Sequence, residues 1–240
     1  MLTLLDHQLW FPPPSQALQD PNGLLAMGGD LSPQRLWLAY QMGIFPWFEQ
    51  GQPMLWWSPD PRAVIAPDQL HVSRSLAKLA RRNRYRLTIN TAFDQVIHAC
   101  RSLREHHEGT WITADIEQAY CQLHRQGHAH SVEVWQENRL VAGLYGISLG
   151  KLFCGESMFH RVDNGSKLAM LGLCRHFSRY GGELVDCQLP NPHLMSLGVQ
   201  TWPRTRFLHK LKQLQQQPLT SGCWQSGELV LCEKSISRLG

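Results

Sequence analysis

The spacing of apolar residues divides most of the chain into segments with helical and strand periods. Apolar side chains three or four positions apart predict amphipathic helices, and apolar side chains at every second position predict strands. After residue 61 the pattern predicts helices beginning near 73, 91, 113, 166, 191 and 206, and strands over 85–90, 130–136, 140–149, 152–159 and 183–188. Short turns join the three middle strands, so we expect them to form an antiparallel meander.

The first 61 residues follow a different pattern, rich in Pro, Gly and Trp. One helix is predicted there, with Ser32 as its N-cap, Pro33 at its first position and Gly43 at its end. Residues 55–62 place paired tryptophans beside two X-Pro steps, which predicts extended backbone. We therefore expect a small N-terminal α/β domain over residues 1–61 and a separate domain over residues 62–240.

The predicted order of elements in residues 62–240 matches one common fold. A strand, two helices, a three-stranded meander, a helix, a strand and a helix are typical of the GNAT-type N-acyltransferase fold. The predicted class is therefore α+β, a mostly antiparallel sheet with helices on both faces, and residues 62–240 are expected to form a GNAT-like catalytic domain. A fold alone indicates no substrate.

The stretch 184–191 looks like a buried strand that ends at a functional site. Two apolar residues lead into Asp186 and then Gln188, and the stretch stops at Pro190-Asn191. Polar side chains at strand ends are where ligands bind in many α/β sheets. The alternative is that Asp186 caps the following helix or pairs with an arginine.

The composition is that of a soluble protein with a substantial core. The chain has 240 residues, of which 43% are hydrophobic and 18% charged. No apolar run reaches the roughly 20 residues that a membrane span needs. The 7 cysteines are dispersed without a CxxC motif, and the 12 histidines show no metal-ligand spacing. We therefore expect reduced thiols, no metal, no membrane association and a cytoplasmic location.

Basic residues cluster along the chain although the net charge is only +4. No acidic residue lies between Asp68 and Asp94, where six cations fall: Arg74, Lys78, Arg81, Arg82, Arg84 and Arg86. Such clustering is typical of a protein with a polyanionic partner, although each cluster also fits a solvated helix face. Several of the 9 tryptophans lie near Gly- and Pro-rich segments, where aromatic side chains often bind ligands.

The loop that follows the third meander strand argues against coenzyme A. Enzymes of this fold that use acyl-CoA hold its pyrophosphate with a glycine-rich loop and a helix N-terminus. Residues 159–167 contain one glycine and an acid, Asp163. An acyl donor carried on a nucleic acid fits both this loop and the basic clusters.

Several motifs resemble the leucyl/phenylalanyl-tRNA–protein transferase family. They include Gly-Ile-Phe-Pro-Trp-Phe at 43–48, Leu-Trp-Trp-Ser-Pro-Asp-Pro-Arg at 55–62, and the segments 21–33, 109–113, 127–131, 153–159 and 186–188. The resemblance implies an aminoacyltransferase that moves Leu, Phe or Met from aminoacyl-tRNA to the α-amine of an N-terminal Arg or Lys. The product would be a degradation signal. No cofactor is expected beyond the charged tRNA.

The resemblance implies that Asp186 and Gln188 are the catalytic pair. Residues two apart on a strand face the same way, so both side chains are expected to reach one point. Our hypothesis is that Asp186 draws the proton from the attacking amine, directly or through Gln188, and that Gln188 positions the amine. The alternative is a purely structural Asp–Gln pair.

The resemblance also implies a substrate-binding set. Its donor-pocket positions are Tyr120, Phe153, Glu156, Leu144, Met170, Leu173 and Val185, of which the last four depart from the family's residues but stay apolar. Glu156 is expected to hold the donor α-amine or to favour a cationic acceptor. Trp47 and Trp111 are expected to stack on the 3′-terminal adenosine. Tyr40 either lines the same cleft or packs in the core.

The basic helix near 73 is expected to bind acceptor-stem phosphates through Arg74, Lys78, Arg81 and Arg82. Two other function classes stay open at this point. One is an acyl-CoA N-acyltransferase, and the other is a non-catalytic binder of tRNA or of N-terminal peptides. Nothing in the sequence requires an oligomer, so a monomer is expected.

Overall fold

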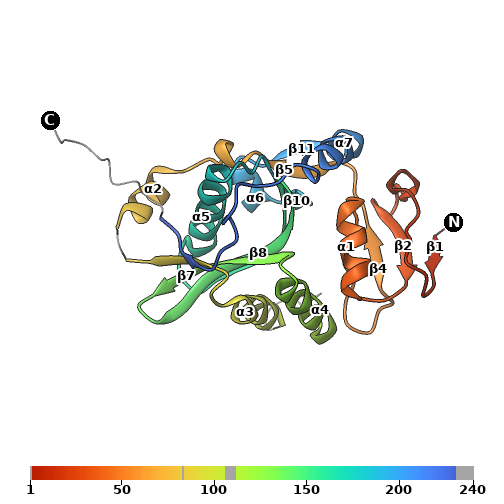
Figure 1. Ribbon diagram of the computed structural model, residues 1–240, viewed down its shortest axis with the longest axis horizontal. Helices are drawn as coiled ribbons and strands as arrows, with labels where there is room; N and C mark the ends of the chain where they lie inside the picture. The colour runs from red at the N-terminus through yellow and green to blue at the C-terminus, as the bar shows by residue number, and fades with distance from the viewer. Residues whose placement is uncertain (1, 83, 106–111, 231–240) are drawn as a thin grey trace.

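The computed structural model describes residues 2–82, 84–105 and 112–230, which fold around two β-sheets (Figure 1). The smaller sheet has four strands in the order β1 (Thr3–Leu5), β2 (Leu24–Gly28), β4 (Leu55–Trp57), β3 (Phe45–Pro46). Helix α1 (Pro33–Gln41) packs beside it, and a short 3₁₀ helix (Pro14–Gln16) precedes it.

The larger sheet has eight strands in the order β11-β5-β10-β9-β8-β7-β6-β12. Their bounds are β5 (Arg62–Ile65), β6 (Arg86–Ile89), β7 (Ala129–Gln136), β8 (Arg139–Leu149), β9 (Leu152–His160), β10 (Leu184–Gln188), β11 (Gln200–Trp202) and β12 (Gly227–Glu228). The helices are α2 (Arg74–Arg81), α3 (Phe93–Glu105), α4 (Ala114–Arg125), α5 (Gly165–Arg179), α6 (Pro192–Ser196) and α7 (Arg204–Leu214), with a 3₁₀ helix at Pro67–Gln69.

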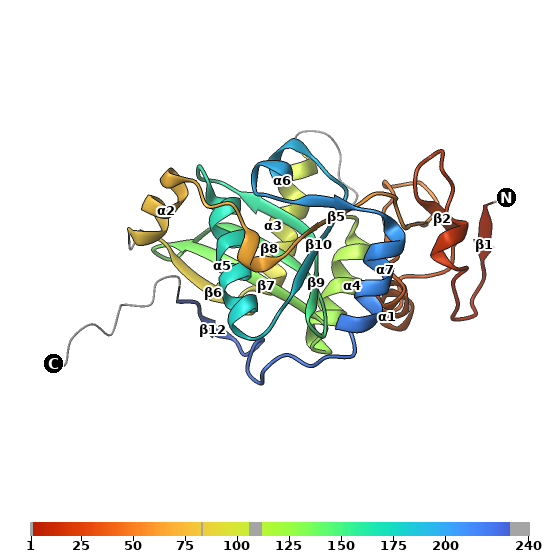
Figure 2. The same cartoon turned by 90° about the horizontal axis from the view of Figure 1, so that it is seen from above.

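Helices cover both faces of the larger sheet (Figures 1 and 2). Helices α3 and α4 lie on one face, and α2 and α5 lie on the other. The strands between them alternate accordingly: in β8, Tyr145 packs into the cluster shared with α3 and α4, whereas Leu144 packs into the cluster shared with α5. The first cluster also contains Leu36 and Trp56, so the small sheet and α1 share a core with the larger sheet.

The main predictions about architecture are confirmed. The class is α+β, the meander β7-β8-β9 is antiparallel, and helices lie on both faces, in the order expected for a GNAT-type domain. The expected cap Ser32 accepts a hydrogen bond from the backbone amide of Arg35, and Ser73 and Thr113, where helices were expected to begin, cap α2 and α4 in the same way. No helix among the described residues is long and apolar enough to cross a membrane. The domain boundary near residue 61 stays a prediction.

The short strands were not predicted. Strands β1, β3, β4, β11 and β12 have two or three residues each, which is too few to show a period. Strand β5 was missed for another reason: all four of its residues are buried, so polar and apolar positions do not alternate.

The strands β9 and β10 run parallel and then separate. Their register ends at Cys154 opposite Asp186, after which β9 continues to His160 while β10 stops at Gln188. On its other side β10 pairs with β5, and a β-bulge lies between Asp186 and Gln188. Gln188 itself has a φ of 55°. The chain therefore turns away from the sheet at this point and leaves space between the two strands.

Gly146 offers a test of how tightly the meander packs beside this space. A Cβ atom there would lie 2.6 Å from Cε1 and 2.7 Å from Cζ of Phe153. We expect Gly146→Ala to lower the free energy of unfolding by about 1–3 kcal/mol, because the Cβ atom would meet the backbone oxygen of Cys154 and the buried ring of Phe153, and neither can easily move. Gly227→Ala is the control, since its Cβ would meet nothing within 4 Å. Equal urea midpoints for the two variants would contradict the packing described here.

Candidate active site

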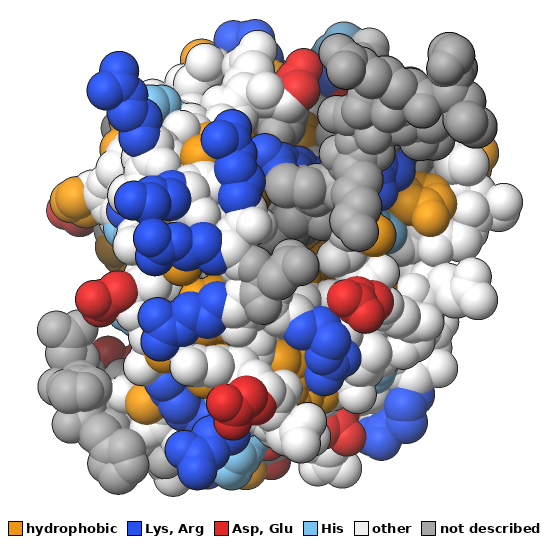
Figure 3. All heavy atoms as spheres, turned by 90° about the vertical axis from the view of Figure 1, so that its left-hand side faces the viewer, with side chains coloured by type: hydrophobic (Ala, Val, Ile, Leu, Met, Phe, Trp, Pro, Cys, Tyr) orange, Lys and Arg blue, Asp and Glu red, His pale blue; other side chains and the backbone are white. Residues whose placement is uncertain are grey.

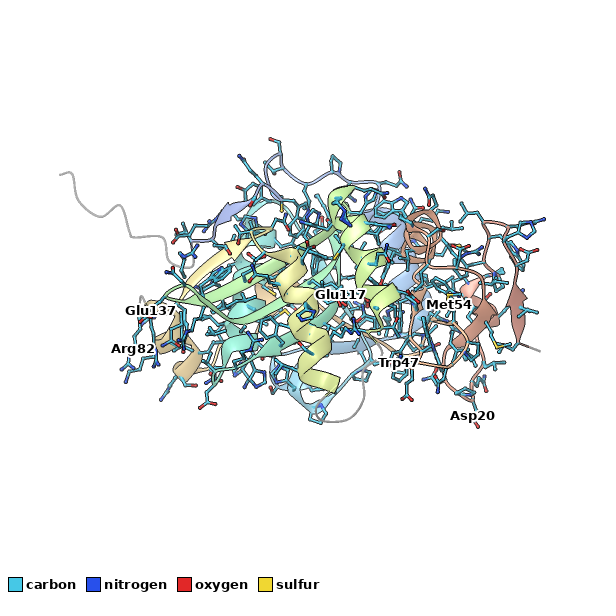
Figure 4. The ribbon with its side chains drawn as sticks, turned by 90° about the horizontal axis from the view of Figure 1, so that it is seen from below. Asp20, Trp47, Met54, Arg82, Glu117 and Glu137 are labelled. Carbon is cyan, nitrogen blue, oxygen red and sulfur yellow. The ribbon has the colours of Figure 1, made fainter. Side chains whose placement is uncertain are left out.

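The space between β9 and β10 opens into a cavity of about 430 Å³. Its walls come from β8, the second half of β9, the end of β10, α5, α6 and the segment Phe45–Trp47 of the small sheet. Trp47 lies where the small sheet meets the larger one (Figure 4). The cavity is therefore shared by both parts of the chain.

One end of the cavity is apolar. Leu144, Met170 and Leu173, three of the predicted donor-pocket residues, line it together with Met158. Phe153 belongs to the same buried cluster but does not line the cavity; its ring packs against Phe177 and Trp224. The structure likewise places Val185 in the core and not on the cavity wall.

The polar end of the cavity is built around Glu156. Gln188 Nε2 donates a hydrogen bond to Glu156 Oε1 at 3.2 Å, and the Tyr120 hydroxyl donates to Glu156 Oε2 at 3.1 Å. The Tyr40 hydroxyl bonds to that of Tyr120. Glu156 and Gln188 line the cavity, whereas Tyr40 and Tyr120 are fully buried behind it. Tyr40 is therefore a core residue that reaches the site through its hydroxyl group.

Glu156 lines the cavity and has a pKa near neutrality. Burial raises its pKa from 4.5 to about 7. The Tyr40 and Tyr120 hydroxyls oppose this by stabilising the carboxylate, nearby Asp186 raises the pKa further, and Arg62 lowers it.

Asp186 lies one layer behind the cavity. It has no exposed surface and forms a bidentate ion pair with Arg62, which donates from Nε to Oδ1 at 2.8 Å and from Nη2 to Oδ2 at 2.7 Å. Asp186 Oδ1 also accepts a hydrogen bond from the backbone amide of Gln188 at 3.0 Å. Its contacts are thus those of the alternative named above, an aspartate paired with an arginine.

The expectation that Asp186 and Gln188 reach one point is wrong. It assumed regular strand alternation, but the bulge between the two residues interrupts that alternation. The positive φ of Gln188 then directs its side chain to the cavity and toward Glu156. The structure therefore brings Gln188 together with Glu156 and places Asp186 beneath Gln188.

The expected RNA contacts lie at two places. Trp47 lines the cavity, is 42% exposed, and accepts a hydrogen bond at its carbonyl from Trp57 Nε1 at 2.7 Å. Trp111 lies outside the described residues. The four cations expected to bind phosphate are exposed, in α2 and at its C-cap, on an end of the molecule where Lys and Arg side chains gather (Figure 3): Arg74, Lys78, Arg81 and Arg82. Arg82 is well separated from Trp47 in Figure 4.

Some residues of the site were missed from the sequence. The sequence analysis gave Arg62 no role of its own. The signal that could have identified it is a charged residue directly before the apolar residues 63–65, where a buried strand begins. Asn191 lines the cavity and also caps α6 by accepting a hydrogen bond from the amide of Leu194 at 2.8 Å. Within the described residues, no group of three or more His, Cys, Asp or Glu side chains could hold a metal ion.

Two family models match the chain. The model for the leucyl/phenylalanyl-tRNA protein transferase matches residues 64–212, and the model for the N-terminal domain of that protein matches residues 29–60. The chain belongs to the leucyl/phenylalanyl-tRNA protein transferase family. The predicted family is therefore confirmed, and the protein is an enzyme of the aminoacyltransferase class.

Curated members of the leucyl/phenylalanyl-tRNA protein transferase family are similar over nearly the whole chain. One from Aeromonas hydrophila is 58% identical over 231 residues, which is 96% of this chain and 98% of the relative. One from Yersinia enterocolitica is 61% identical over 224 residues, which is 93% of this chain and 94% of the relative.

Two solved structures were also found. They are a GCN5-related N-acetyltransferase from Kribbella flavida (TM-score 0.38, 11% identity, 70% of this chain and 59% of that one) and L-PGS from Bacillus licheniformis (TM-score 0.43, 9% identity, 80% of this chain and 71% of that one).

Glu156→Gln tests the environment of the cavity carboxyl group. A carboxyl whose pKa rises on folding stabilises the native state fully below its ordinary value, 4.5, and loses this contribution as pH rises through about 7. We therefore expect the unfolding free energy of the unaltered protein to fall relative to that of Glu156→Gln across this window, measured by urea denaturation at several pH values. The exposed Glu137→Gln is the control and should show no such divergence. A difference between the protein and Glu156→Gln that stays constant with pH would refute this assignment.

Proposed function

We propose that this enzyme transfers Leu, Phe or Met from aminoacyl-tRNA to the α-amine of an N-terminal Arg or Lys of an acceptor protein. The observation that carries the proposal is one cavity with an apolar wall, a Glu156–Gln188 pair and an exposed indole at its edge. These three parts fit the three parts of the donor: an apolar side chain, an aminoacyl ester and a terminal adenosine.

The reaction needs little chemical activation. The amine nitrogen attacks the ester carbonyl carbon, the bond from that carbon to the ribose oxygen breaks, and one amine proton is transferred to that oxygen, so that the ribose leaves with a free hydroxyl group. Because the ester is already reactive, the barrier is mainly a matter of position and proton removal. The acceptor α-amine has a pKa of about 7.7–8.0, so a usable fraction is neutral at physiological pH.

We assign the proton to Glu156 and the orientation of the amine to Gln188. The pKa of Glu156, about 7, is close to that of the acceptor amine, which suits proton transfer between the two groups. Gln188 donates a hydrogen bond to Glu156 from Nε2. The Oε1 atom of Gln188 is then the one that can accept a hydrogen bond from the incoming amine. Direct transfer to Asp186 has less support, because both of its oxygens are bound to Arg62 and it does not line the cavity.

The apolar end of the cavity accounts for the donor side chain. Leu144, Met170 and Leu173 enclose an apolar space that unbranched or γ-branched side chains can enter. Rejection of β-branched donors by shape alone is limited to about 1–3 kcal/mol. A cationic acceptor residue is favoured by the negative charge that Glu156 carries when ionised.

The RNA part of the donor has two contacts in this proposal. The 3′-terminal adenosine stacks on Trp47, with Trp111 as a second stacking residue. Exposed α2 cations bind acceptor-stem phosphates without reading sequence, so affinity falls steeply with salt. We further propose that the enzyme acts as a monomer in the cytoplasm, where charged tRNA and new N-termini are both available.

A direct transfer assay tests the function. Leucyl-tRNA carrying radiolabelled leucine is incubated with the protein and a peptide that begins with Arg, and label is expected in the peptide because the free amine can attack the ester. The same peptide with an acetylated N-terminus should stay unlabelled. Labelled acetyl-CoA in place of leucyl-tRNA should also give no product. Label from acetyl-CoA would support the acyl-CoA enzyme, and tRNA binding without any transfer would support the non-catalytic binder.

Trp47→Ala tests the stacking contact. Loss of a base–aromatic stack worth about 1–3 kcal/mol should weaken leucyl-tRNA binding by about 5- to 150-fold, measured by filter binding. Trp10→Ala is a matched control, because Trp10 is 40% exposed and does not line the cavity, whereas Trp47 is 42% exposed and does. Equal affinities for the two variants would count against adenosine stacking on Trp47.

A further inference from the structure

Arg62 is a buried cation at the junction of the two sheets. It begins β5, has 1% of its surface exposed, and is among the largest fully buried side chains. Besides its ion pair with Asp186, Arg62 donates from Nη1 to the carbonyl oxygen of Gly43 at 3.1 Å. Its guanidinium group lies over the rings of Phe45 and Phe207, 4.9 and 4.6 Å from their centroids.

On one side these contacts lead to the polar end of the cavity. Arg62 holds Asp186, Asp186 accepts from the backbone amide of Gln188, and Gln188 donates to Glu156. The amide that receives this support belongs to a residue at φ 55° next to a β-bulge. The neighbouring strand does not set the orientation of Gln188 by regular pairing, so the hydrogen bond to Asp186 contributes to it.

On the other side the contacts lead to the aromatic edge of the cavity. Gly43 and Phe45 lie directly before Pro46 and Trp47, and Phe45, Pro46 and Trp47 all line the cavity. Gly43 has a φ of 74° and packs closely on α7, where a Cβ atom would lie 3.1 Å from the Phe207 ring. One guanidinium group therefore contacts the segment that carries Trp47 and the strand that carries Gln188.

We propose that Arg62 is a positioning residue that fixes the position of the aromatic edge of the cavity relative to Gln188. Through Arg62, the segment that carries Trp47 and the Gln188 side chain that orients the acceptor amine keep a fixed separation. This proposal rests on the function proposed above.

Stability alone does not require this arrangement. Burying two charges costs about as much as their attraction returns, and apolar side chains of similar volume can replace such pairs without loss of stability. What the pair supplies is direction, because a planar guanidinium with N–H groups in a fixed fork specifies the relative orientation of its partners. A lysine would supply the charge without the fork.

The test uses two variants of the full chain and a matched control. Arg62→Lys keeps both charges, so any loss of transfer cannot come from a missing carboxylate. The double variant Arg62→Met/Asp186→Leu removes both charges together, and we expect it to fold because apolar side chains of similar volume can replace a buried ion pair. Arg35→Lys is the control, because Arg35 is also 1% exposed and paired with an aspartate, Asp30, but its other hydrogen bonds go to the carbonyl oxygens of Asp6, Gln8 and Trp10, far from β10 and from residues 43–48 in the sequence.

We expect both Arg62 variants to lose about 100-fold in kcat for leucyl transfer, as misplacement by about 1 Å does in other enzymes. The Kd for leucyl-tRNA should change far less, since Trp47 and the α2 cations remain. Amide hydrogen exchange should rise together in residues 43–48 and 186–189. Arg35→Lys should leave kcat and exchange in these segments unchanged.

Three outcomes are decisive. Normal kcat in the folded double variant would overturn the proposal, because the ion pair would then serve charge balance alone. Increased exchange in only one of the two segments would also overturn it. Absence of transfer by the unaltered protein would refute the proposed function instead, while the exchange measurement would still show whether Arg62 couples the two segments.

Discussion

The ion pair between Arg62 and Asp186 is the contact on which the arrangement of the site depends. A carboxylate with no exposed surface needs a cation and further hydrogen bonds in its place, and here both oxygens are bound by one guanidinium. That guanidinium also donates a hydrogen bond to the carbonyl oxygen of Gly43 and lies over the rings of Phe45 and Phe207. Four segments distant in sequence therefore meet at a single group: β5, β10, α7 and residues 43–45.

The pair also separates the roles of the two acids near the cavity. Asp186 has its charge matched by Arg62, and it also accepts a hydrogen bond from the backbone amide of Gln188. Glu156 has hydroxyl and amide donors but no directly bound cation among the described residues, so burial raises its pKa to about 7. Two carboxyl groups with neighbouring positions in the sheet thus differ in environment, which is how one site obtains a structural acid and a titrating one.

The sequence was sufficient to predict most long elements and the family, but not the geometry of the site. Periods of 3.6 and 2, together with the turn residues that bound them, identified elements such as α4, α5 and β8 because those elements are long. Strands of two or three residues carry no period, so an α/β domain was predicted for the N-terminal segment without the positions of β1, β3 and β4. The positions of Asp186 and Gln188 were predicted from alternation, and one bulge made that prediction wrong. Arg62 and Asp186 are 124 residues apart, and no local pattern specifies such a partner.

The cavity itself follows from where the parallel pairing of β9 and β10 stops. Hydrogen bonds hold the two strands together as far as Cys154 and Asp186. Beyond that point the strands separate, and side chains line the space between them. A bulge and a positive φ then place an amide at the border, where regular strand geometry would have paired it. The strand end supplies both the space for an acyl donor and the group that faces it. The β-bulge that made the prediction from strand alternation wrong is therefore also the feature that brings Gln188 to the cavity.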